Sequence, residues 1–279
     1  MIRAAAGDAD LELCVRVLAA VEGVHLSLDQ LRPVQERLLL HASGLGYALV
    51  NHSSVAGSAY AMVRVVPSAR RRGIGSALAD AAAEAARRLG KESAWGIVQP
   101  EDPASLRFAE SRGFREVGRD VNLTRRLEPR GGRVRAGILE LADEHRAGAY
   151  AVAVAAIPDM VTAGAAEARP YEDWVESELA GAAAAFVAIE DAHVVGYATL
   201  QPFGGDPKRL EHGFTGVLPE YRRRGIATAL GDAQIAWAAS RGYEELVTTT
   251  GVTNVGLRRQ KAKLGYSEEA GPILVRGPV

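Results

Sequence analysis

The sequence predicts two tandem α+β domains, each built from β-strands and helices. The length of 279 residues fits two domains of about 150 residues each. Hydrophobic residues make up 48% and charged residues 24% of the chain, which is ordinary for globular domains that bury a core. A third observation, an internal repeat, predicts the tandem arrangement.

One segment of the chain occurs twice. Residues 65–90 and 217–242 are identical at 13 of 26 positions when they are aligned at a constant offset of 152. The same offset places Gly113 on Gly265, each followed by an aromatic residue, so nothing is inserted or deleted between the two landmarks. Unrelated segments would share only a few residues, so the sequence contains two copies of one domain.

A charged stretch at residues 128–133 contains Pro129 and two glycines and has the character of a linker. We therefore predict an N-terminal domain over residues 1–130 and a C-terminal domain over residues 131–279. The copies differ ahead of the repeated segment, where about 20 residues are missing from the first. The front of the N-terminal domain is thus predicted to be shortened.

Hydrophobic periodicity and turn residues define the elements of the second copy. The predicted strands are residues 134–140, 184–189, 194–200, 211–217, 246–250 and 272–276. The predicted helices are residues 145–157, 171–180, 226–241 and 254–264. In the first copy, a strand at residues 60–65 and a helix at residues 76–89 match the elements around the repeated turn.

The repeated turn joins a strand to a long helix and contains three arginines and a glycine. Gly73 and Gly225 allow a ligand to approach the backbone closely. The amides that follow are unpaired N–H groups at a helix N-terminus, where the helix dipole also favours an anion. Together with the arginines they predict a pyrophosphate site. The predicted cofactor-binding residues are Val65, Val66, Arg70, Arg71, Arg72, Gly73, Ile74, Gly75 and Ser76 in the first copy, and Val217, Leu218, Arg222, Arg223, Arg224, Gly225, Ile226, Ala227 and Thr228 in the second.

These turns resemble the signature of the GNAT superfamily of acyl-CoA N-acyltransferases, (Arg/Gln)-x-x-Gly-x-(Gly/Ala). The matching residues are Arg70, Gly73 and Gly75 in the first copy and Arg222, Gly225 and Ala227 in the second. A second family element, an Asn that opens a helix ending in Gly-aromatic, matches Asn254 and Gly265, whereas the first copy has Asp102 in place of the Asn. The resemblance covers nearly all of the second copy and the latter two-thirds of the first.

The resemblance implies both a fold and a reaction. Each domain is expected to contain a mixed, mostly antiparallel sheet flanked by helices. Acetyl-CoA is the expected cosubstrate, no metal is expected, and an acetyl group is transferred to a primary amine of a small molecule or protein by direct attack. The strand before the turn is expected to bulge and to present backbone N–H groups to the thioester carbonyl. Gly213 and Gly216 suit such a bulge.

The candidate catalytic residues are Glu211, His212 and Asn254. An amine must lose a proton before it attacks, and Glu211 is the first candidate for the base, directly or through water, with His212 second. The two are adjacent on a strand and point to opposite faces, so a solvent-facing Glu beside a buried His is an equally open interpretation. Asn254 is expected to cap its helix, contact the cofactor, or do both. Many family members have a tyrosine acid four residues before the glycine; Ala109 and Lys261 stand there, so that role is unassigned.

The C-terminal domain is the expected catalyst. The strand at residues 60–65 has no carboxylate or histidine, so the N-terminal domain is expected to bind acyl-CoA weakly or only to serve structurally. Acidic residues surround Tyr171 and Trp174, and they predict either a rim that attracts a cationic amine or a solvated helix face. The acidic residues are Glu167, Glu172, Asp173, Glu176 and Glu178.

Other classes of function are alternatives or are disfavoured. A module that binds acyl-CoA without turnover, as a sensor or scaffold, is the alternative. The net charge of −1 disfavours nucleic acid as a partner. We expect no signal peptide and no membrane span, and the single cysteine excludes an intrachain disulfide and a cysteine metal cluster. We expect a cytoplasmic location, and either a monomer or a homodimer.

Overall fold

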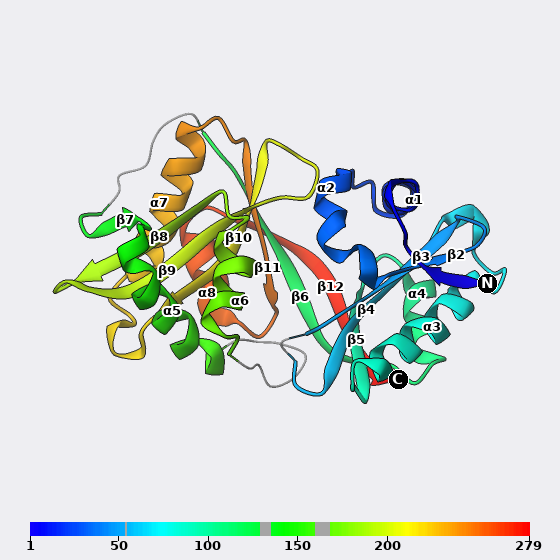
Figure 1. Cartoon of the computed structure of the whole chain (residues 1–279). Helices are drawn as coiled ribbons and strands as arrows, with labels where there is room; N and C mark the ends of the chain where they lie inside the picture. Colours follow the sequence, from blue (N-terminus) through cyan, green and yellow to red (C-terminus); the bar gives the residue numbers. More distant parts are fainter. Residues whose placement is uncertain (54, 129–134, 160–167) are drawn as a thin grey trace. The chain divides into compact units, whose positions relative to one another are not determined.

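The computed structural model describes residues 1–53, 55–128, 135–159 and 168–279, and these form two compact units (Figure 1). Unit 1 comprises Met1–Arg119 and Pro272–Val279. Unit 2 comprises the described residues between Asp120 and Gly271. Both units combine a mixed sheet with helices, which confirms the predicted fold class.

Unit 1 has a sheet in the order β1-β2-β3-β4-β5-β12. Its strands are β1 (Ile2–Ala4), β2 (Leu38–His41), β3 (Gly46–Asn51), β4 (Ser58–Val65), β5 (Ser93–Val98) and the end of β12 (Ser267–Pro278). Its helices are α1 (Asp8–Glu22), α2 (Leu28–Leu31), α3 (Ile74–Arg88) and α4 (Pro103–Glu110). Strands β4 and β5 are parallel, and the other paired neighbours in this unit are antiparallel.

Unit 2 repeats this plan, with a sheet in the order β6-β11-β10-β9-β8-β7. Its strands are β7 (Ile138–Glu140), β8 (Ala184–Glu190), β9 (His193–Pro202), β10 (Arg209–Val217), β11 (Glu245–Gly251) and most of β6 (Arg115–Arg126). Its helices are α5 (Arg146–Ala155), α6 (Tyr171–Trp174), α7 (Ile226–Ser240) and α8 (Val255–Lys263). Here β10 and β11 are the parallel pair.

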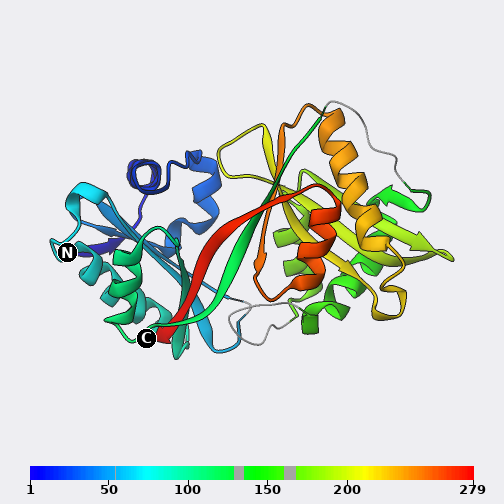
Figure 2. The ribbon, with the colours of Figure 1, turned by 180° about the vertical axis from the view of Figure 1, so that it is seen from behind.

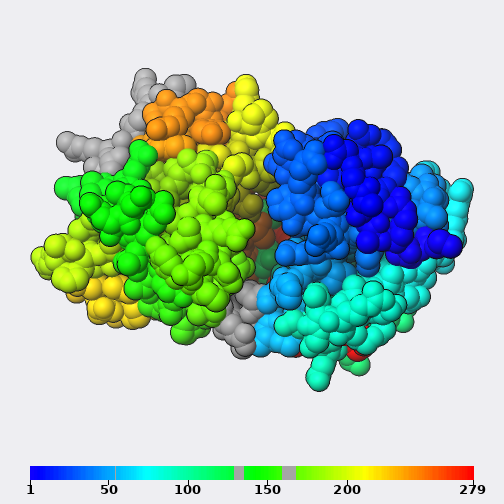
Figure 3. All heavy atoms as spheres, viewed as in Figure 1, coloured from blue at the N-terminus to red at the C-terminus, as the bar shows by residue number. Residues whose placement is uncertain are grey.

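The last strand of each sequence copy belongs to the sheet of the other unit. In unit 1, β12 pairs with β5, and Pro278 lies opposite Ser93. In unit 2, β6 pairs with β11, and Arg126 lies opposite Glu245. The chain end marked C accordingly lies among the elements of unit 1, beside α3, α4 and β5 (Figures 1 and 2), and its red atoms emerge among the cyan ones in the space-filling view (Figure 3). The boundary at residue 130, which separates the two sequence repeats, remains a prediction. The two compact units have other boundaries, after Arg119 and before Pro272, because the last strands are exchanged.

The helices that follow the two Arg-rich turns anchor each unit. In α3, Ile74, Leu78, Ala82 and Ala86 recur every four residues, so they line one face of the helix and are buried against the sheet. Helix α7 is buried on most of its surface. The positions that match this face of α3 are buried, including a glutamine, and so are further residues beside them: Ile226, Leu230, Gln234 and Ala238, with Ala229, Gly231, Ala233, Ile235 and Ala236. This packing fixes the N-terminus of each helix, and with it the preceding turn.

Most of the elements predicted for the second copy are confirmed within a few residues, with two corrections. The predicted strand at residues 134–140 is reduced to β7, because residues 135–137 form a turn; residue 134 and most of the predicted linker lie outside the described residues. The predicted helix at residues 171–180 is α6 followed by a π-helical turn, Val175–Leu179. None of the helices in the described ranges is long and apolar enough to cross a membrane.

Candidate functional site

The two Arg-rich turns, residues 66–73 and 218–225, have the same backbone conformation. Their middle arginines adopt a left-handed conformation, with φ of 64° at Arg71 and 61° at Arg223. Gly73 and Gly225 follow with φ of 80° and 79° and serve as the N-caps of α3 and α7. An L-residue with a side chain is strained at such φ values, so conformation rather than crowding explains both glycines.

Each turn presents backbone donors and positive charge at one place. In α7 the first backbone bond to the cap is Ala229 N–H to Gly225 O, at 2.9 Å, so the three amides before Ala229 precede the helical ladder. In α3 the matching bond is Ala77 N–H to Gly73 O, at 3.0 Å. Arg223 is exposed, as are the two residues after it, Arg224 and Gly225. Both turns are therefore built to bind an anion such as a phosphate.

The predicted cofactor-binding residues divide into two roles. The side chains of Ile74, Ile226 and Val217 are buried in the core, so only their backbone groups could reach a ligand. Arg222 Nε donates to the Val217 carbonyl at 3.0 Å, and Arg70 Nε donates to the Val65 carbonyl at 3.4 Å. These bonds tie the first arginine of each turn to the end of the preceding strand.

A gap between two parallel strands opens toward each turn. Residues Arg209–Glu211 of β10 pair with Glu245–Val247 of β11. In these strands, which the structure describes in full, the later residues of β10 have no partner in β11. In unit 1 the corresponding pairing of β4 with β5 ends at Tyr60 and Trp95. The separated strand edges carry backbone N–H and C=O groups that an extended ligand can pair with.

The predicted bulge is present in β10. Its pairing with β9 shifts between His212 and Thr215, so two residues of β10 lie opposite Thr199. The Phe214 N–H donates to the Thr199 hydroxyl at 3.1 Å. A Cβ at Gly213 would lie 2.3 Å from the same hydroxyl oxygen, so only glycine fits there. Strand β4 pairs with β3 in unbroken register, so unit 1 lacks this bulge within the described strands.

His212 is the centre of a buried polar network, which we call the His212 network and define as His212, Gln234, Lys261 and Tyr266. The Gln234 amide nitrogen donates to the Thr199 carbonyl at 2.8 Å, so its oxygen faces His212 Nδ1 as an acceptor, at 3.0 Å. Nδ1 therefore carries the proton, and Nε2 accepts the Tyr266 hydroxyl at 2.5 Å. Burial, and then the positive charge of Lys261, hold the pKa of His212 well below its ordinary value.

Lys261 is buried, although a lysine on a short polar helix would ordinarily be solvated. Its side chain is 2% exposed, and its Nζ lies 4.8 Å from the centre of the Tyr266 ring. Burial lowers the pKa of Lys261 to about 7. Burial therefore works against the positive charge of this amine, which lies near a neutral histidine.

Glu211 points to the opposite face of β10 from His212, as the strand geometry predicts. It lies opposite Gln201 on β9 and Val247 on β11, at the point where the gap begins. Its side chain is half-buried, and burial raises the pKa of its carboxyl. A carboxylate with a raised pKa at the start of the gap has the properties of a general base.

Asn254 caps α8. Its side-chain oxygen accepts the Leu257 N–H at 3.2 Å, and its amide nitrogen donates to the Thr250 hydroxyl at 3.1 Å. The capping role predicted for Asn254 is thus present, and both ends of its side chain are engaged. Thr248, like Thr250, is buried.

Unit 1 has neither the Glu211 carboxylate nor the His212 network at the matching positions. The last paired residue before the gap is Tyr60, where unit 2 has Glu211, and its ring packs 4.7 Å from that of Trp95. The positions of the His212 network are occupied by residues without ionisable groups. These are Ala61, Ala82, Ala109 and Phe114. Gly96, the next residue on β5, passes so close to β4 that a Cβ there would lie 2.4 Å from the Ala61 carbonyl oxygen.

An aromatic cluster covers the face of unit 2 that carries Glu211. Its rings are Tyr150, Tyr171, Trp174, Tyr197 and Phe214, with successive centroids 5.3–6.0 Å apart. Glu178 is half-buried, and burial raises the pKa of its carboxyl. Glu172, Asp173 and Glu176 are exposed, and Glu167 lies outside the described residues.

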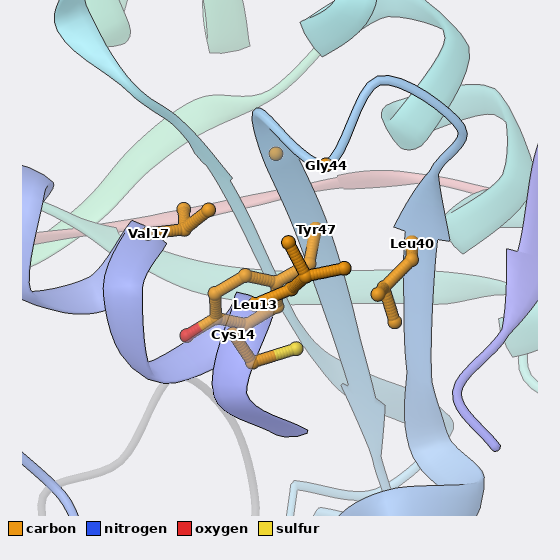
Figure 4. A pocket seen from close by; sticks show the side chains of 7 residues that line it. Leu13, Cys14, Val17, Leu40, Gly44 and Tyr47 are labelled. Carbon is orange, nitrogen blue, oxygen red and sulfur yellow. The ribbon is translucent and has the colours of Figure 1, made fainter. Parts of the chain in front are cut away.

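A small pocket in unit 1 is core packing rather than a ligand site (Figure 4). Leu13, Cys14 and Val17 reach it from α1, and Leu40 and Tyr47 reach it from β2 and β3, so its walls are largely apolar. It has no room for a water molecule. Burial raises the pKa of the Cys14 thiol to about 12. The described residues contain no group of three or more side chains that could hold a metal ion.

Sequence reasoning missed Thr199 and the partners of His212. A glutamine within the apolar helix at residues 226–241 was a usable signal, because a buried polar residue needs a partner. Tyr266 and Lys261 carried no such signal, since their contact with His212 depends on how α8 and β12 fold back over β10.

Both units thus place an Arg-rich turn beside a gap between parallel strands, and this arrangement occurs twice in one chain. A sequence model of the acetyltransferase (GNAT) family matches residues 43–114 and 149–266. The chain belongs to this acetyltransferase family, and its sequence carries the family domain twice.

Solved structures show the same tandem fold. A GCN5-related N-acetyltransferase from Sphaerobacter thermophilus matches with a TM-score of 0.75 at 21% identity, over 100% of this chain and 95% of that one. A tandem GNAT protein from the clavulanic acid biosynthesis pathway matches with a TM-score of 0.76 at 18% identity, over 100% and 97%. A putative acetyltransferase from Pyrococcus horikoshii matches with a TM-score of 0.65 at 15% identity, over 100% and 89%. No curated protein matches the sequence.

Proposed function

We propose that the protein is a cytoplasmic N-acetyltransferase that moves an acetyl group from acetyl-CoA to a primary amine, and that unit 2 is the catalyst. The observation that carries this proposal is the combination, found in unit 2, of an anion-binding turn, a strand gap, a bulge and a half-buried carboxylate at the start of the gap. Unit 1 has the turn and the gap without the bulge or the carboxylate.

Each feature of unit 2 has a task in this reaction. The turn amides and arginines bind the pyrophosphate of acetyl-CoA. The unpaired edges of β10 and β11 accept the amide groups of the extended pantetheine arm. The bulge places backbone N–H groups beside the thioester carbonyl, where negative charge develops during attack. No metal is needed for any of these steps.

The remaining task is to remove a proton from the acceptor. An amine with a pKa of ~10.4 is uncharged in about 1 molecule in 2,500 at pH 7, a penalty of roughly 4.6 kcal/mol. We assign the base to Glu211, which takes one proton from the ammonium group directly or through water. The neutral nitrogen then attacks the thioester carbon, the carbon–sulfur bond breaks, and the thiolate leaves with the electron pair. The nitrogen loses a second proton as the amide forms, and this proton goes to the thiolate to give free CoA.

His212 is less suited to act as the base. Its Nδ1 proton is bound to Gln234 and its Nε2 lone pair accepts from Tyr266, so it has no ring nitrogen left for a substrate. We propose that His212 holds the bulge in place. Asn254 is likewise proposed to position the gap edge by capping α8, with any contact to pantetheine made by its backbone.

A cationic amine is the proposed acceptor. Trp174 and Tyr197 of the aromatic cluster are buried in the core, whereas its other three rings and Glu178 are half-buried. Aromatic faces next to a carboxylate attract ammonium groups.

The deciding experiment follows release of the CoA thiol from acetyl-CoA with a panel of polyamines, aminoglycosides, amino acids and basic peptides. We expect release that depends on one class of amine and is faster for polycationic members. Binding of acetyl-CoA without release for any acceptor would favour a sensor or scaffold. Equal rates with neutral amines would contradict the role of the cluster and Glu178.

A further inference from the structure

An arginine from outside the second Arg-rich turn reaches the end of that turn. Arg135 Nη1 donates to the Arg224 carbonyl at 3.2 Å, and the same nitrogen lies 4.0 Å from the point where a Cβ on Gly225 would stand. Gly225 is the N-cap of α7. The guanidinium of Arg135 therefore lies at the N-terminal end of α7, where backbone amides and the helix dipole favour an anion.

The fold holds Arg135 at this place. The Arg135 carbonyl accepts the Ile138 N–H at 3.2 Å, so a turn leads from Arg135 into β7. Within the turn, Gly137 has a φ of 84°, and its carbonyl accepts the Ile189 N–H at 2.8 Å. A Cβ on Gly137 would lie 2.9 Å from the Ile189 carbonyl oxygen, so the turn packs directly against β8. These contacts attach the backbone next to Arg135 to the end of β8.

The charges around Arg135 leave an excess of positive charge. Arg135 Nη2 lies 3.9 Å from one carboxylate oxygen of Glu190, and Arg224 Nη1 lies 3.5 Å from the other, so two guanidinium groups share one carboxylate. Residues 220–223 add one glutamate and two arginines, which makes four arginines and two glutamates in all. The Arg135 side chain is 52% exposed, and a guanidinium has several N–H donors, so its bond to Arg224 does not prevent it from donating to a ligand.

We propose that Arg135 binds a phosphate group of acyl-CoA at the second Arg-rich turn and so increases the affinity of unit 2 for this cosubstrate. The proposal rests on the proposed function, which assigns acetyl-CoA to this turn. A planar guanidinium can donate two parallel hydrogen bonds to a phosphate. CoA carries a pyrophosphate and a 3′-phosphate, and the same chemistry suits both. Glu190 competes with the ligand for Arg135 and Arg224, so its carboxylate weakens binding.

Titration calorimetry of the full-length protein with acetyl-CoA tests the proposal. Arg135→Gln removes the charge and should weaken binding about tenfold. The loss should shrink at high salt, because salt screens exposed charges. Arg241→Gln is the matched control: Arg241 is exposed at the other end of α7, so this variant should bind like wild type. Equal affinity of R135Q and R241Q, or a loss that does not depend on salt, would overturn the proposal.

Glu190→Gln separates phosphate binding from a purely structural ion pair. If Arg135 only pairs with Glu190 and holds the turn, E190Q should weaken binding as much as R135Q does. If Arg135 binds phosphate, E190Q removes a competing carboxylate and should bind acetyl-CoA at least as tightly as wild type. A loss in E190Q that equals the loss in R135Q would therefore contradict the proposal.

A comparison of CoA with 3′-dephospho-CoA identifies the phosphate that Arg135 binds. A difference between wild type and R135Q that is present with CoA and absent with 3′-dephospho-CoA assigns Arg135 to the 3′-phosphate. A difference of equal size with both probes assigns it to the pyrophosphate. Failure of the wild-type protein to bind acetyl-CoA would overturn the proposed function and the role of Arg135 with it, whereas equal binding by R135Q and wild type would overturn only the role of Arg135.

Discussion

Units 1 and 2 share the Arg-rich turn and differ in the strand that leads to it. Strand β4 pairs with β3 in regular register from Tyr60 to Val65. Strand β10 instead bulges at Gly213 and carries Glu211 and His212 on opposite faces. The turn is a backbone feature that needs glycine and a helix N-terminus. The catalytic features need specific polar side chains with buried partners. A copy of the domain can therefore keep the Arg-rich turn while it lacks the polar side chains.

The partners in unit 2 also depend on one another. The bulge is held by Thr199, whose carbonyl binds Gln234, which in turn fixes the proton on His212. Replacing any one of these residues leaves a buried polar atom unpaired, which typically costs about 1–3 kcal/mol. In unit 1 the residues that match the His212 network are apolar, so none of their side chains needs a hydrogen-bond partner.

The largest expected effect separates the two turns. Gly225→Asp adds a negative charge and a side chain where φ is 79°, so it should lower kcat/KM more than 100-fold. The matched change Gly73→Asp, at φ of 80°, should leave turnover within twofold of wild type. Steady-state assays of CoA release compare the two. Loss of activity in G73D with activity retained in G225D would reverse the proposed roles of the units.

The next effect concerns Glu211. Glu211→Gln should lower kcat/KM about 100-fold, within the range expected for loss of a general base. Because the active base is the carboxylate and burial raises its pKa, the wild-type rate should fall as the pH drops through that raised pKa. The E211Q profile should lack this acid limb. Tyr60→Phe, at the matching position of unit 1, is the control and should leave the profile as in wild type.

A third effect concerns stability and the buried amine of Lys261. Its pKa is about 7 in the folded protein and near 10.5 when exposed, so the unfolded chain binds more protons between these values. Stability should therefore fall as the pH decreases from about 10 to about 7 and then level off. Lys261→Met removes this penalty, so its gain in unfolding free energy should be roughly 2 kcal/mol larger at pH 7 than at pH 9.

Urea unfolding of both proteins at the two pH values measures this difference. Lys263→Met is the control, because Lys263 is an exposed lysine on the same helix and should show no such pH dependence. A pH-independent effect of K261M would show that Lys261 is solvated in the native protein.

The smallest effect concerns the hydroxyl of Tyr266. Tyr266→Phe leaves the buried His212 Nε2 without its donor and should destabilise unit 2 by about 1–2 kcal/mol. The ring of Tyr243 stacks on Trp237, and its hydroxyl forms no hydrogen bond with the described residues, so Tyr243→Phe should change stability by less than about 0.5 kcal/mol. Thermal unfolding of the two variants makes the comparison, and equal shifts would argue against the buried bond.

The sequence predicted what depends on local pattern. The Arg-rich turns, the helices that follow them and the bulge at Gly213 were all visible as motifs or glycine positions. The burial of Lys261 was not visible, because it depends on tertiary packing against Tyr266 rather than on helix periodicity. The exchange of β6 and β12 was also hidden, since hydrophobic alternation identifies a strand but not its neighbours.

The exchanged strands set the order in which the nascent chain can finish folding. Residues 272–279 complete the sheet of unit 1 beside β5, but the ribosome makes them after all of unit 2. Until then β5 is an exposed sheet edge with unpaired backbone groups, which is a site for aggregation. A gene fragment that ends near residue 130 would make that exposure permanent. A rearranged chain that carries residues 272–279 directly after residue 119 would give unit 1 its missing strand during synthesis.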